Sequence, residues 1–351
     1  MPHADARPLT VLSVAYPFAP VTADPAGGAE QVLAQIDRAL VSAGHRSVVV
    51  AAEGSLTAGE LSSVTQPSGT LDDGACADVR SLVRDRVSGA LAAGDVDVVH
   101  LHGVDFADYL PAPSRTPKVV SLHLPLDWYP EGALAPGRDD VWLQPVSEDQ
   151  ARRAPPSAAA LAPPIANGVD VEAYAPAPSH GDYALVIARV AEEKGFHLAL
   201  DAARLADAPL LACGKLYPYA AHQQYFEAQV RPRLDDRRRF LGPVEGARKR
   251  ELLAGARCLL APFTAPETSS LVSMEALASG VPVIAFRSGA LAEIVEDGVT
   301  GFLVDGVEEM ADAIRRVDRI DRARCREAAC RRFPVQRATD AYLDLYRRLA
   351  A

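Results

Sequence analysis

The chain has 351 residues, of which 49% are hydrophobic and 23% are charged, and its formal net charge is −10. This length exceeds what one hydrophobic core usually serves, so we expect a globular protein of two domains. Residues 1–150 carry 9 basic and 20 acidic side chains, and the remaining residues are almost neutral. An acidic first domain repels polyanions, which argues against nucleic acid as a partner and against stable association with anionic membranes.

No apolar run approaches the ~20 residues that span a bilayer, and the first ten residues lack the basic and apolar regions of a signal peptide. We therefore expect a cytoplasmic protein. The five cysteines are scattered, without a CxxC pair or a histidine at zinc-ligand spacing, which predicts reduced thiols and no metal site. They are Cys76, Cys213, Cys258, Cys325 and Cys330.

The first half of the chain alternates short β-rich runs with helical stretches. Residues 9–18 read as a buried strand, 27–45 as an amphipathic helix and 47–54 as the next strand. Further β-branched and apolar runs follow at 96–103, 118–125 and 141–147. Strands separated by helices are typical of a parallel, doubly wound sheet.

Residues 152–181 are rich in proline and alanine, as expected for a connection between domains rather than a core element. The alternation then restarts, with strands expected at 183–190, 209–215, 239–244, 258–263 and 282–286 and helices at 195–206 and 246–256. The sequence therefore predicts two Rossmann-like α/β domains, 1–165 and 166–335, that face each other across a ligand cleft. Residues 336–351 read as an amphipathic helix that we expect to cross back to the first domain.

Residues 265–286, APETSSLVSMEALASGVPVIAF, hold two glutamates in apolar surroundings. We expect a helix that Ser269 or Ser270 caps and that Gly280 ends, with Glu267 in the preceding loop and Glu275 inside the helix. Free amides at the helix start favour a phosphate, so the layout suits a sugar nucleotide. The alternative interpretation is a capped core helix in which one glutamate is salt-bridged.

Cations and glycines near other strand ends support the nucleotide interpretation. Arg189 follows a strand and Lys194 precedes a helix, so both are placed where a diphosphate would lie, although they can also pair with Glu192 or Glu193. The Gly27–Gly28 pair between the first strand and first helix lets the backbone approach a phosphate or sugar closely.

With these motifs the chain resembles the retaining, nucleotide-sugar-dependent glycosyltransferases of family 4, which have the GT-B fold. The resemblance runs almost end to end. Its most specific part is the pair of glutamates separated by seven residues in PETSSLVSMEALASGVPVIAFRSGALAEIVEDGVTGFLVD. Supporting segments are GGAEQVL, DVDVVHLH, VVSLHLP, PVSE, IANGVD, ARVAEEKG and FLGPV.

The resemblance implies a role for each donor-site residue. Glu275 would bind the ribose hydroxyls and Glu267 the transferred sugar. Arg189 and Lys194 would neutralise the diphosphate, together with the amides near Ser270 and Leu271, and Gly27 and Gly28 would shape the loop beside it.

The resemblance also covers the histidines of the first half. His123 matches the active-site histidine, His102 would line the acceptor side or pack, and His100 would be structural. Ser269 and Ser270 replace a common Phe-Gly pair, which leaves the donor sugar open.

The resemblance also implies transfer with retention of anomeric configuration, without a catalytic metal or another cofactor, from a nucleotide that in this family is most often UDP. The chemical rival is a metal-dependent transferase that would use Asp95 and Asp97, but this pair directly precedes a strand, where aspartate is unremarkable. A catalytically silent nucleotide-sugar-binding protein and an epimerase or phosphorylase on the same frame are further rivals.

Loops 102–110 and 123–132 are expected to bind the acceptor in the first domain. They carry Asp105, Asp127 and Trp128, together with Asp108, Tyr129 and Glu131, and few basic residues. We therefore expect a soluble polyhydroxy or cationic acceptor, such as a sugar, an aminocyclitol or a natural-product intermediate. A lipid or polysaccharide acceptor is the alternative, and these acids can also simply solvate surface loops. The sequence leaves the oligomeric state open.

Overall fold

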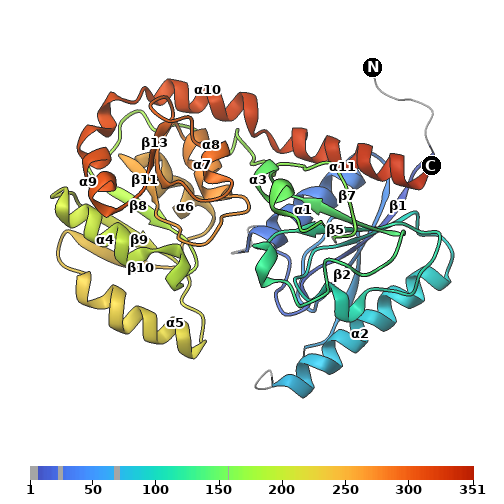
Figure 1. Ribbon diagram of the computed structural model, residues 1–351. Helices are drawn as coiled ribbons and strands as arrows, with labels where there is room; N and C mark the ends of the chain where they lie inside the picture. The colour runs from blue at the N-terminus through green and yellow to red at the C-terminus, as the bar shows by residue number, and fades with distance from the viewer. Residues whose placement is uncertain (1–6, 23–26, 67–71, 157) are drawn as a thin grey trace. The chain divides into compact units, whose positions relative to one another are not determined.

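The chain forms two β-sheets, each built of parallel strands (Figure 1). The computed structural model describes residues 7–22, 27–66, 72–156 and 158–351. By its contacts the chain divides into two units, one formed by Met1–Ala166 with Gln336–Ala351 and the other by Asn167–Val335.

The sheet of the first unit has the order β3-β2-β1-β4-β5-β6-β7, and all of its pairings are parallel. Its strands are β1 (Thr10–Val14), β2 (Arg46–Ala52), β3 (Glu60–Val64), β4 (Val98–Leu101), β5 (Lys118–Leu122), β6 (Val141–Pro145) and β7 (Ala160–Leu161). The helices are α1 (Gly28–Ser42), α2 (Asp73–Ala92), α3 (Glu148–Arg153) and α11 (Val335–Ala350), with short turns η1 (Phe106–Tyr109) and η2 (Leu126–Trp128).

The sheet of the second unit repeats this pattern as β10-β9-β8-β11-β12-β13, again entirely parallel. Its strands are β8 (Ala184–Ile187), β9 (Leu210–Cys213), β10 (Arg238–Gly242), β11 (Cys258–Ala261), β12 (Val283–Phe286) and β13 (Gly301–Val304). The helices are α4 (Phe196–Leu205), α5 (Ala220–Tyr225), α6 (Gly246–Gly255), α7 (Leu271–Ala278), α8 (Leu291–Ile294), α9 (Val307–Arg316) and α10 (Arg322–Arg332).

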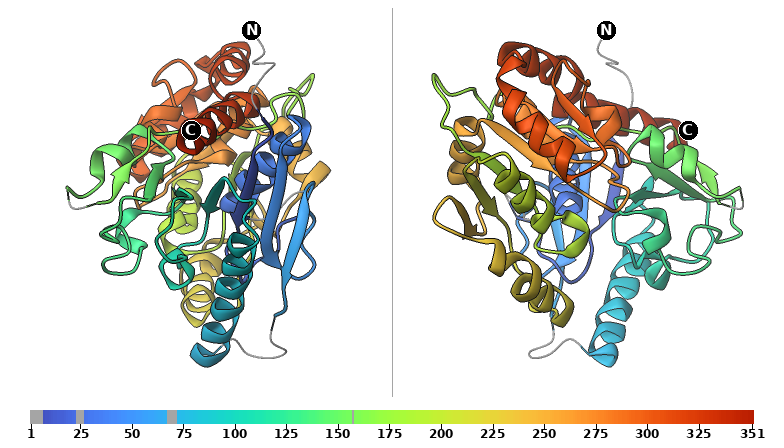
Figure 2. Two further views of the ribbon diagram at one scale, coloured as in Figure 1. Left: turned by 90° about the vertical axis from the view of Figure 1, so that its right-hand side faces the viewer. Right: turned by 60° about the vertical axis from the view of Figure 1, so that its left-hand side comes forward.

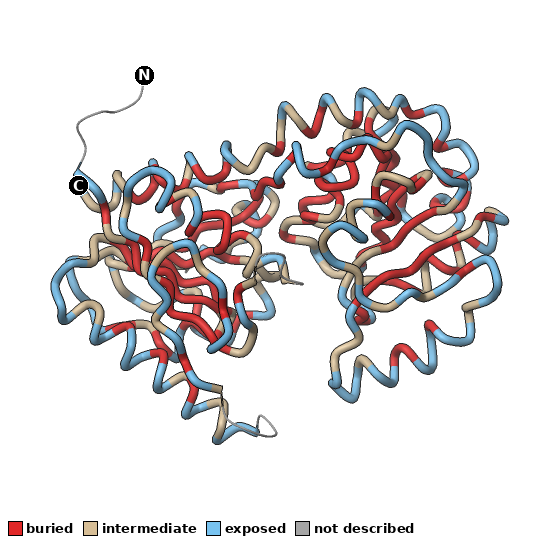
Figure 3. Tube along the Cα trace, turned by 180° about the vertical axis from the view of Figure 1, so that it is seen from behind, coloured by how far each residue is buried: buried red, intermediate tan, exposed pale blue. Residues whose placement is uncertain are grey.

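Each sheet is covered by helices, and its central strands are the most buried part of its unit (Figures 2 and 3). In the second unit α4 packs against α9, while α7 packs against α6 and α10. Strands buried on both faces read as continuous apolar runs, which is why the strand predictions from sequence are confirmed. The doubly wound fold class is confirmed as well.

Alternation along β4 and β5 gives the first sheet two different faces. Val99, Leu101, Val120 and Leu122 join the core cluster that includes Val83 of α2. His100 and Ser121 point the other way, because successive side chains of a strand alternate between faces. There they meet α11: the Tyr346 hydroxyl is 2.6 Å from His100 Nδ1, and the Tyr342 hydroxyl is 3.1 Å from Ser121 Oγ. The last helix therefore belongs to the core of the first unit.

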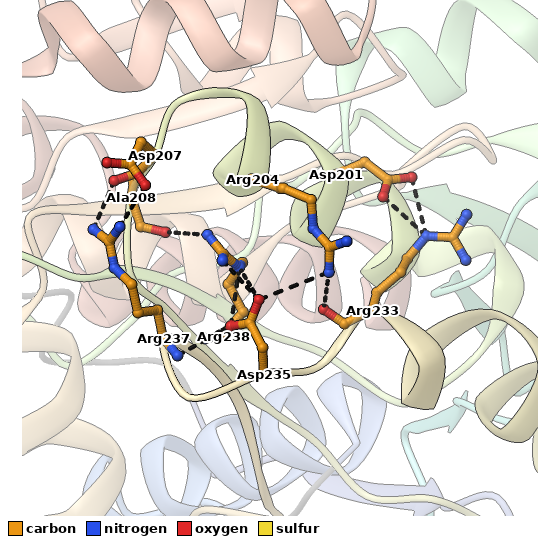
Figure 4. A network of polar contacts seen from close by, with 8 residues as sticks. All are labelled: Asp201, Arg204, Asp207, Ala208, Arg233, Asp235, Arg237 and Arg238. Carbon is orange, nitrogen blue, oxygen red and sulfur yellow. Dashed lines mark hydrogen bonds and ion pairs between the residues drawn. The ribbon is translucent and has the colours of Figure 1, made fainter.

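Ion pairs tie the start of β10 to neighbouring segments of the second unit (Figure 4). Asp235 accepts hydrogen bonds from Arg238, including one of 2.6 Å, and lies 3.8 Å from Arg204 at the end of α4. The Arg233 guanidinium pairs with Asp201 at 3.0 Å. Apart from Arg238 these groups are at least partly exposed, so we assign them a local role in holding the loop rather than a large share of the stability.

Several elements were not predicted from the sequence. They are strands β3 and β13 and helices α2, α3, α5, α8, α9 and α10, while β7 lies within the stretch that we expected to be only a connection. Strand β3 has one buried residue, Val64, and α2 buries only Val79, Val83 and Val87. Such narrow apolar patterns give a weak signal in the sequence.

Candidate functional site

The two predicted diphosphate cations lie at the carboxyl edge of the second sheet. Arg189 follows β8 by two residues, and Lys194 ends the turn η3 (Glu192–Lys194) that leads into α4. Strands β8 and β11 are neighbours, so the strand order reverses here, and doubly wound sheets bind ligands at such a point. Arg189 pairs with Glu193 at 2.8 Å, which is the alternative partner that the sequence offered.

Lys194 also has an internal partner, and that partner is the first glutamate of the motif. Its ammonium lies 2.5 Å from a Glu267 carboxylate oxygen and 4.4 Å from the centre of the Phe263 ring. The Lys194 and Glu267 side chains remain 21% and 13% exposed, so a ligand can reach both. The structure thus brings together one predicted phosphate-binding residue and one predicted sugar-binding residue.

A tight loop before α8 holds the backbone around Glu267. The Ala290 amide donates to the Glu267 carbonyl oxygen at 2.7 Å, and Ser288 Oγ donates to the Ala265 carbonyl oxygen at 2.7 Å. Gly289 has a φ of +54°, and a Cβ there would lie 2.2 Å from the Glu267 carbonyl oxygen. Glycine is therefore required at this position both for its backbone conformation and for space.

Helix α7 begins as predicted, with Ser270 at the N-cap position, but the serine side chains do not cap it. Ser270 Oγ contacts Ser273 Oγ at 2.8 Å instead. Among the described residues, Ser269 Oγ is buried without a hydrogen-bond partner, and the amides of Leu271 and Val272 donate to no acceptor. The start of this helix therefore offers unused donors beside Glu267.

Glu275 is completely buried in α7, and its charge is compensated inside the protein. Lys249 of α6 lies 2.7 Å from one carboxylate oxygen and 2.8 Å from the other, to which the Tyr174 hydroxyl also donates at 2.8 Å. The ion pair at Oε2 lacks hydrogen-bond geometry, although its distance is short. A ribose would have to displace these groups to reach Glu275, so its predicted ribose contact stays a prediction.

The two glycines of the first loop stand where α1 starts: Gly27 is the N-cap residue and Gly28 opens the helix. Residues 23–26, the rest of this predicted loop, lie outside the described residues. A Cβ on Gly27 would lie 1.9 Å from a carboxylate oxygen of Glu30. Burial raises the pKa of Glu30, and a hydrogen bond from its own backbone partly opposes this. The glycine thus accommodates a partly buried acid of the first helical turn.

Three histidines gather at the adjoining carboxyl ends of β4 and β5: His100 lies within β4, and His102 and His123 directly follow β4 and β5. His102 Nδ1 lies 2.9 Å from His123 Nε2, and the ring of His100 lies 3.9 Å from that of His102. Burial lowers the pKa of His123 to about 4 and, with the neighbouring histidines, holds the pKa of His100 and His102 well below 6.5. All three side chains are therefore neutral at neutral pH. His100 is structural, as predicted.

The predicted acceptor residues separate into two kinds. Asp105 is buried and used internally: it accepts hydrogen bonds from Arg80 Nε at 2.9 Å and from the Tyr109 hydroxyl at 3.0 Å. Asp127 and Trp128 lie in η2 on the surface, and Trp128 is 38% exposed. Asp127 and Trp128 therefore present side chains that a ligand can contact without rearrangement.

The Asp95–Asp97 pair precedes β4, at the amino edge of the first sheet. Asp97 accepts a hydrogen bond of 2.8 Å from the Thr10 amide, which ties the start of β1 to the segment before β4. This structural role accounts for the aspartate. All five cysteines are free thiols, as predicted. Among the described residues no helix is long and apolar enough to cross a membrane.

Sequence reasoning missed Lys249, Tyr174 and Arg80, which are the internal partners of predicted site residues. One signal was available for Lys249, because lysine is rare here: the chain has 36 basic residues, and the lysines are Lys118, Lys194, Lys215 and Lys249. Two of these four pair with the glutamates of the motif. Nothing local in the sequence marks Tyr174 or Arg80.

Comparisons with known proteins agree with the two-unit organisation. The Glycosyltransferase Family 4 model matches residues 26–154, and the Glycosyl transferases group 1 model matches residues 181–318. The phosphatidyl-myo-inositol mannosyltransferase of Mycobacterium tuberculosis is 32% identical over 247 residues, which are 62% of each chain. The match thus spans about three fifths of that relative's length.

Solved structures share the fold across nearly the whole chain. AviGT4, a glycosyltransferase involved in avilamycin A biosynthesis, superposes with a TM-score of 0.69 at 24% identity and covers 98% of both chains. HepE of Anabaena in complex with UDP-glucose gives 0.73 at 21% identity, covering 96% of this chain and 99% of that one. The chain therefore belongs to the glycosyltransferases of family 4 and group 1, and its two Rossmann-like domains are those of the GT-B fold.

Proposed function

We propose that the protein transfers a hexosyl or aminohexosyl unit from a nucleotide sugar, with UDP as the nucleotide, to a hydroxyl group of a small acceptor. The observation that carries the proposal is the Lys194–Glu267 pair at the carboxyl edge of the second sheet, beside unused amides at the start of α7. The UDP-glucose complex of the similar HepE structure supports the choice of nucleotide.

The internal ion pairs give the donor a defined way to enter. A diphosphate competes with the Glu193 and Glu267 carboxylates for Arg189 and Lys194, since phosphate oxygens also form charge-assisted hydrogen bonds with these cations. Once Lys194 turns to the diphosphate, Glu267 is free to accept hydrogen bonds from hydroxyls of the sugar. One exchange of partners thus prepares Lys194 for the diphosphate and Glu267 for the sugar.

In the reaction that we propose, the bond between the sugar C1 and the diphosphate oxygen breaks while the acceptor oxygen bonds to C1 from the same face. The anomeric configuration is retained, and the acceptor proton passes to a diphosphate oxygen. Arg189 and Lys194 stabilise the charge that grows on the leaving group, so the proposal includes no metal ion. Full activity in the presence of EDTA is the expected result, and loss that Mg²⁺ restores would contradict it.

For the acceptor we propose a soluble polyhydroxy compound, such as a sugar, an aminocyclitol or a natural-product intermediate. The exposed Asp127 and Trp128 support it, since a carboxylate and an aromatic ring suit a hydroxylated ring. The role of AviGT4 in avilamycin A biosynthesis fits the same class. A lipid acceptor is the second candidate, because the mycobacterial relative is named for phosphatidyl-myo-inositol. An assay that compares transfer to soluble cyclitols with transfer to phosphatidylinositol in vesicles distinguishes the two candidates.

A panel of nucleotide sugars tests the donor directly. A bound donor raises the melting temperature by mass action, and the responding nucleotide sugar is then used in a transfer assay. We expect Glu267→Ala to abolish transfer, whereas Glu308→Ala, at an exposed position of α9, leaves it unchanged. If no nucleotide sugar stabilises the protein, or if both variants are equally active, the proposal fails. Five free thiols agree with a reducing, cytoplasmic location, which we include in the proposal.

A further inference from the structure

His102, which is buried, pairs with the partly exposed His123. The rings are stacked, with centroids 5.2 Å apart and an interplanar angle of 12°. His102 is 3% exposed, and among the described residues its Nε2 makes no hydrogen bond. Its Nδ1 is 2.9 Å from His123 Nε2, so one of the two rings donates a proton to the other.

The geometry allows two assignments of that proton. A neutral imidazole has one N–H donor and one acceptor nitrogen. If His123 donates from Nε2, His102 carries its own proton on the unpartnered Nε2 and buries an unsatisfied N–H group. If His102 donates from Nδ1, its Nε2 is only an unused lone pair. Buried N–H groups without an acceptor are the rarer and costlier case, so the second assignment is favoured.

The surroundings hold His102 in the position that this donation needs. Its ring packs against His100 at a centroid distance of 3.9 Å. His100 is itself held on both sides, by the Tyr346 hydroxyl at 2.6 Å and by Ser121 Oγ at 2.8 Å. The orientation of His102 is therefore set by the strand and by α11, independently of any ligand.

We propose that His102 is a positioning residue that fixes His123 in the tautomer with the proton on Nδ1. Without this neighbour, a neutral histidine in water prefers the proton on Nε2, so His102 reverses the intrinsic preference. This inference rests on the proposed function for its consequence: His123, the predicted active-site histidine, carries its N–H donor on Nδ1 while its Nε2 accepts from His102, so no tautomer change precedes binding.

Ring-nitrogen NMR of protein labelled with ¹⁵N-histidine at pH 7.5 tests the assignment without any substrate. We expect His123 to show a protonated Nδ1 and an unprotonated Nε2, with its signals identified by their loss in His123→Gln. In His102→Leu the Nδ1–H tautomer of His123 should be lost. In His102→Asn, whose amide places a donor near the position of Nδ1, it should be retained. A His123 protonated on Nε2 in the wild-type protein overturns the proposal, even if the leucine variant does not fold.

A second test of the proposal measures kcat and KM with the active nucleotide sugar. The loss of one hydrogen bond predicts a fall of about three- to tenfold in kcat for His102→Leu, near-normal activity for His102→Asn, and little change in the KM of the acceptor. Equal losses in both variants would contradict a positioning role. If the wild-type protein has no transferase activity, the proposed function fails, whereas the NMR result still decides the tautomer.

Discussion

At the scale of single residues, the glutamates of the motif differ in what surrounds them. Glu267 is partly exposed and pairs with Lys194, while Glu275 has no exposed surface and pairs with Lys249 and Tyr174. A fully buried carboxylate is stable only when its charge is balanced and its oxygens are hydrogen-bonded. Lys249 therefore decides whether the apolar helix α7 can contain an acid.

Removing Lys249 should destabilise the second unit strongly. Lys249→Met leaves the Glu275 carboxylate buried and uncompensated, which costs about 3–5 kcal/mol. Tyr174→Phe removes one hydrogen bond and costs about 1 kcal/mol. Cys213, Cys258 and Cys325 are buried in the second unit, so the urea midpoint of thiol labelling measures the effect. The double variant Lys249→Met/Glu275→Leu should recover most of the loss; failure to recover would show that Lys249 acts by packing and not by charge.

The lowered pKa values of His100, His102 and His123 predict that the first unit loses stability in mild acid. Their pKa values are lowered in the folded state, to about 4 for His123, whereas the unfolded chain titrates near 6.5. Folding thus keeps these groups neutral, so their contribution is complete above pH 6.5 and is lost as the pH falls towards 4. Tyr342 and Tyr346 face His100 and supply no carboxylate to offset its protonation.

Fluorescence of Trp128 and Trp142, which both lie in the first unit, reports this loss as a falling urea midpoint between pH 7 and 4.5. His100→Gln should reduce the slope, and His180→Gln, at an exposed position of the second unit, should leave it unchanged. A midpoint that is flat from pH 7 to 4.5 would mean that the histidines are not neutralised by folding.

At the scale of elements, the site depends on the loop before α8, which holds the backbone of Glu267. Gly289 combines a left-handed backbone with close contact to the Glu267 backbone, while Gly298 has a similar backbone, with a φ of +74°, and open space around it. Gly289→Ala should therefore displace Glu267 and lower kcat by about tenfold or more, because small misplacements of reacting groups are costly. Gly298→Ala carries the same backbone strain and should lower only the melting temperature. Equal kcat values in the two variants would show that the loop does not position Glu267 for catalysis.

Local signals in the sequence predicted the elements of the site but not their partners. Gly280 has a φ of +69° just beyond α7 and ends that helix as predicted, and Glu267 and Glu275 fall before and inside it as predicted. The partners of Glu275 come from positions 26 and 101 residues away, which only the packing of α6 and the preceding connection brings near. Strand β3 and helix α2 were missed because each buries very few residues, and propensity cannot replace an absent apolar pattern.

At the scale of the whole molecule, the chain leaves the first unit once and returns to it through α11. Tyr342 and Tyr346 are among the largest fully buried side chains, and their hydroxyls contact Gln144 and His100 at 2.6 Å each. The core of the first unit is therefore completed by residues that follow the whole second unit in sequence. During synthesis this core cannot close until the last helix has been made.

Tyr346→Ala should for that reason destabilise the first unit alone. The cavity that replaces a buried aromatic ring costs about 3–5 kcal/mol, whereas Arg348→Ala, on the exposed side of the same helix, should cost less than about 0.5 kcal/mol. Tryptophan fluorescence follows the first unit, and labelling of Cys213 and Cys258 follows the second, so the two transitions can be separated in one protein. We expect the fluorescence midpoint to fall while the labelling midpoint stays. If both fall together, the units unfold as one cooperative body, and the stability of the donor site then depends on the C-terminal helix.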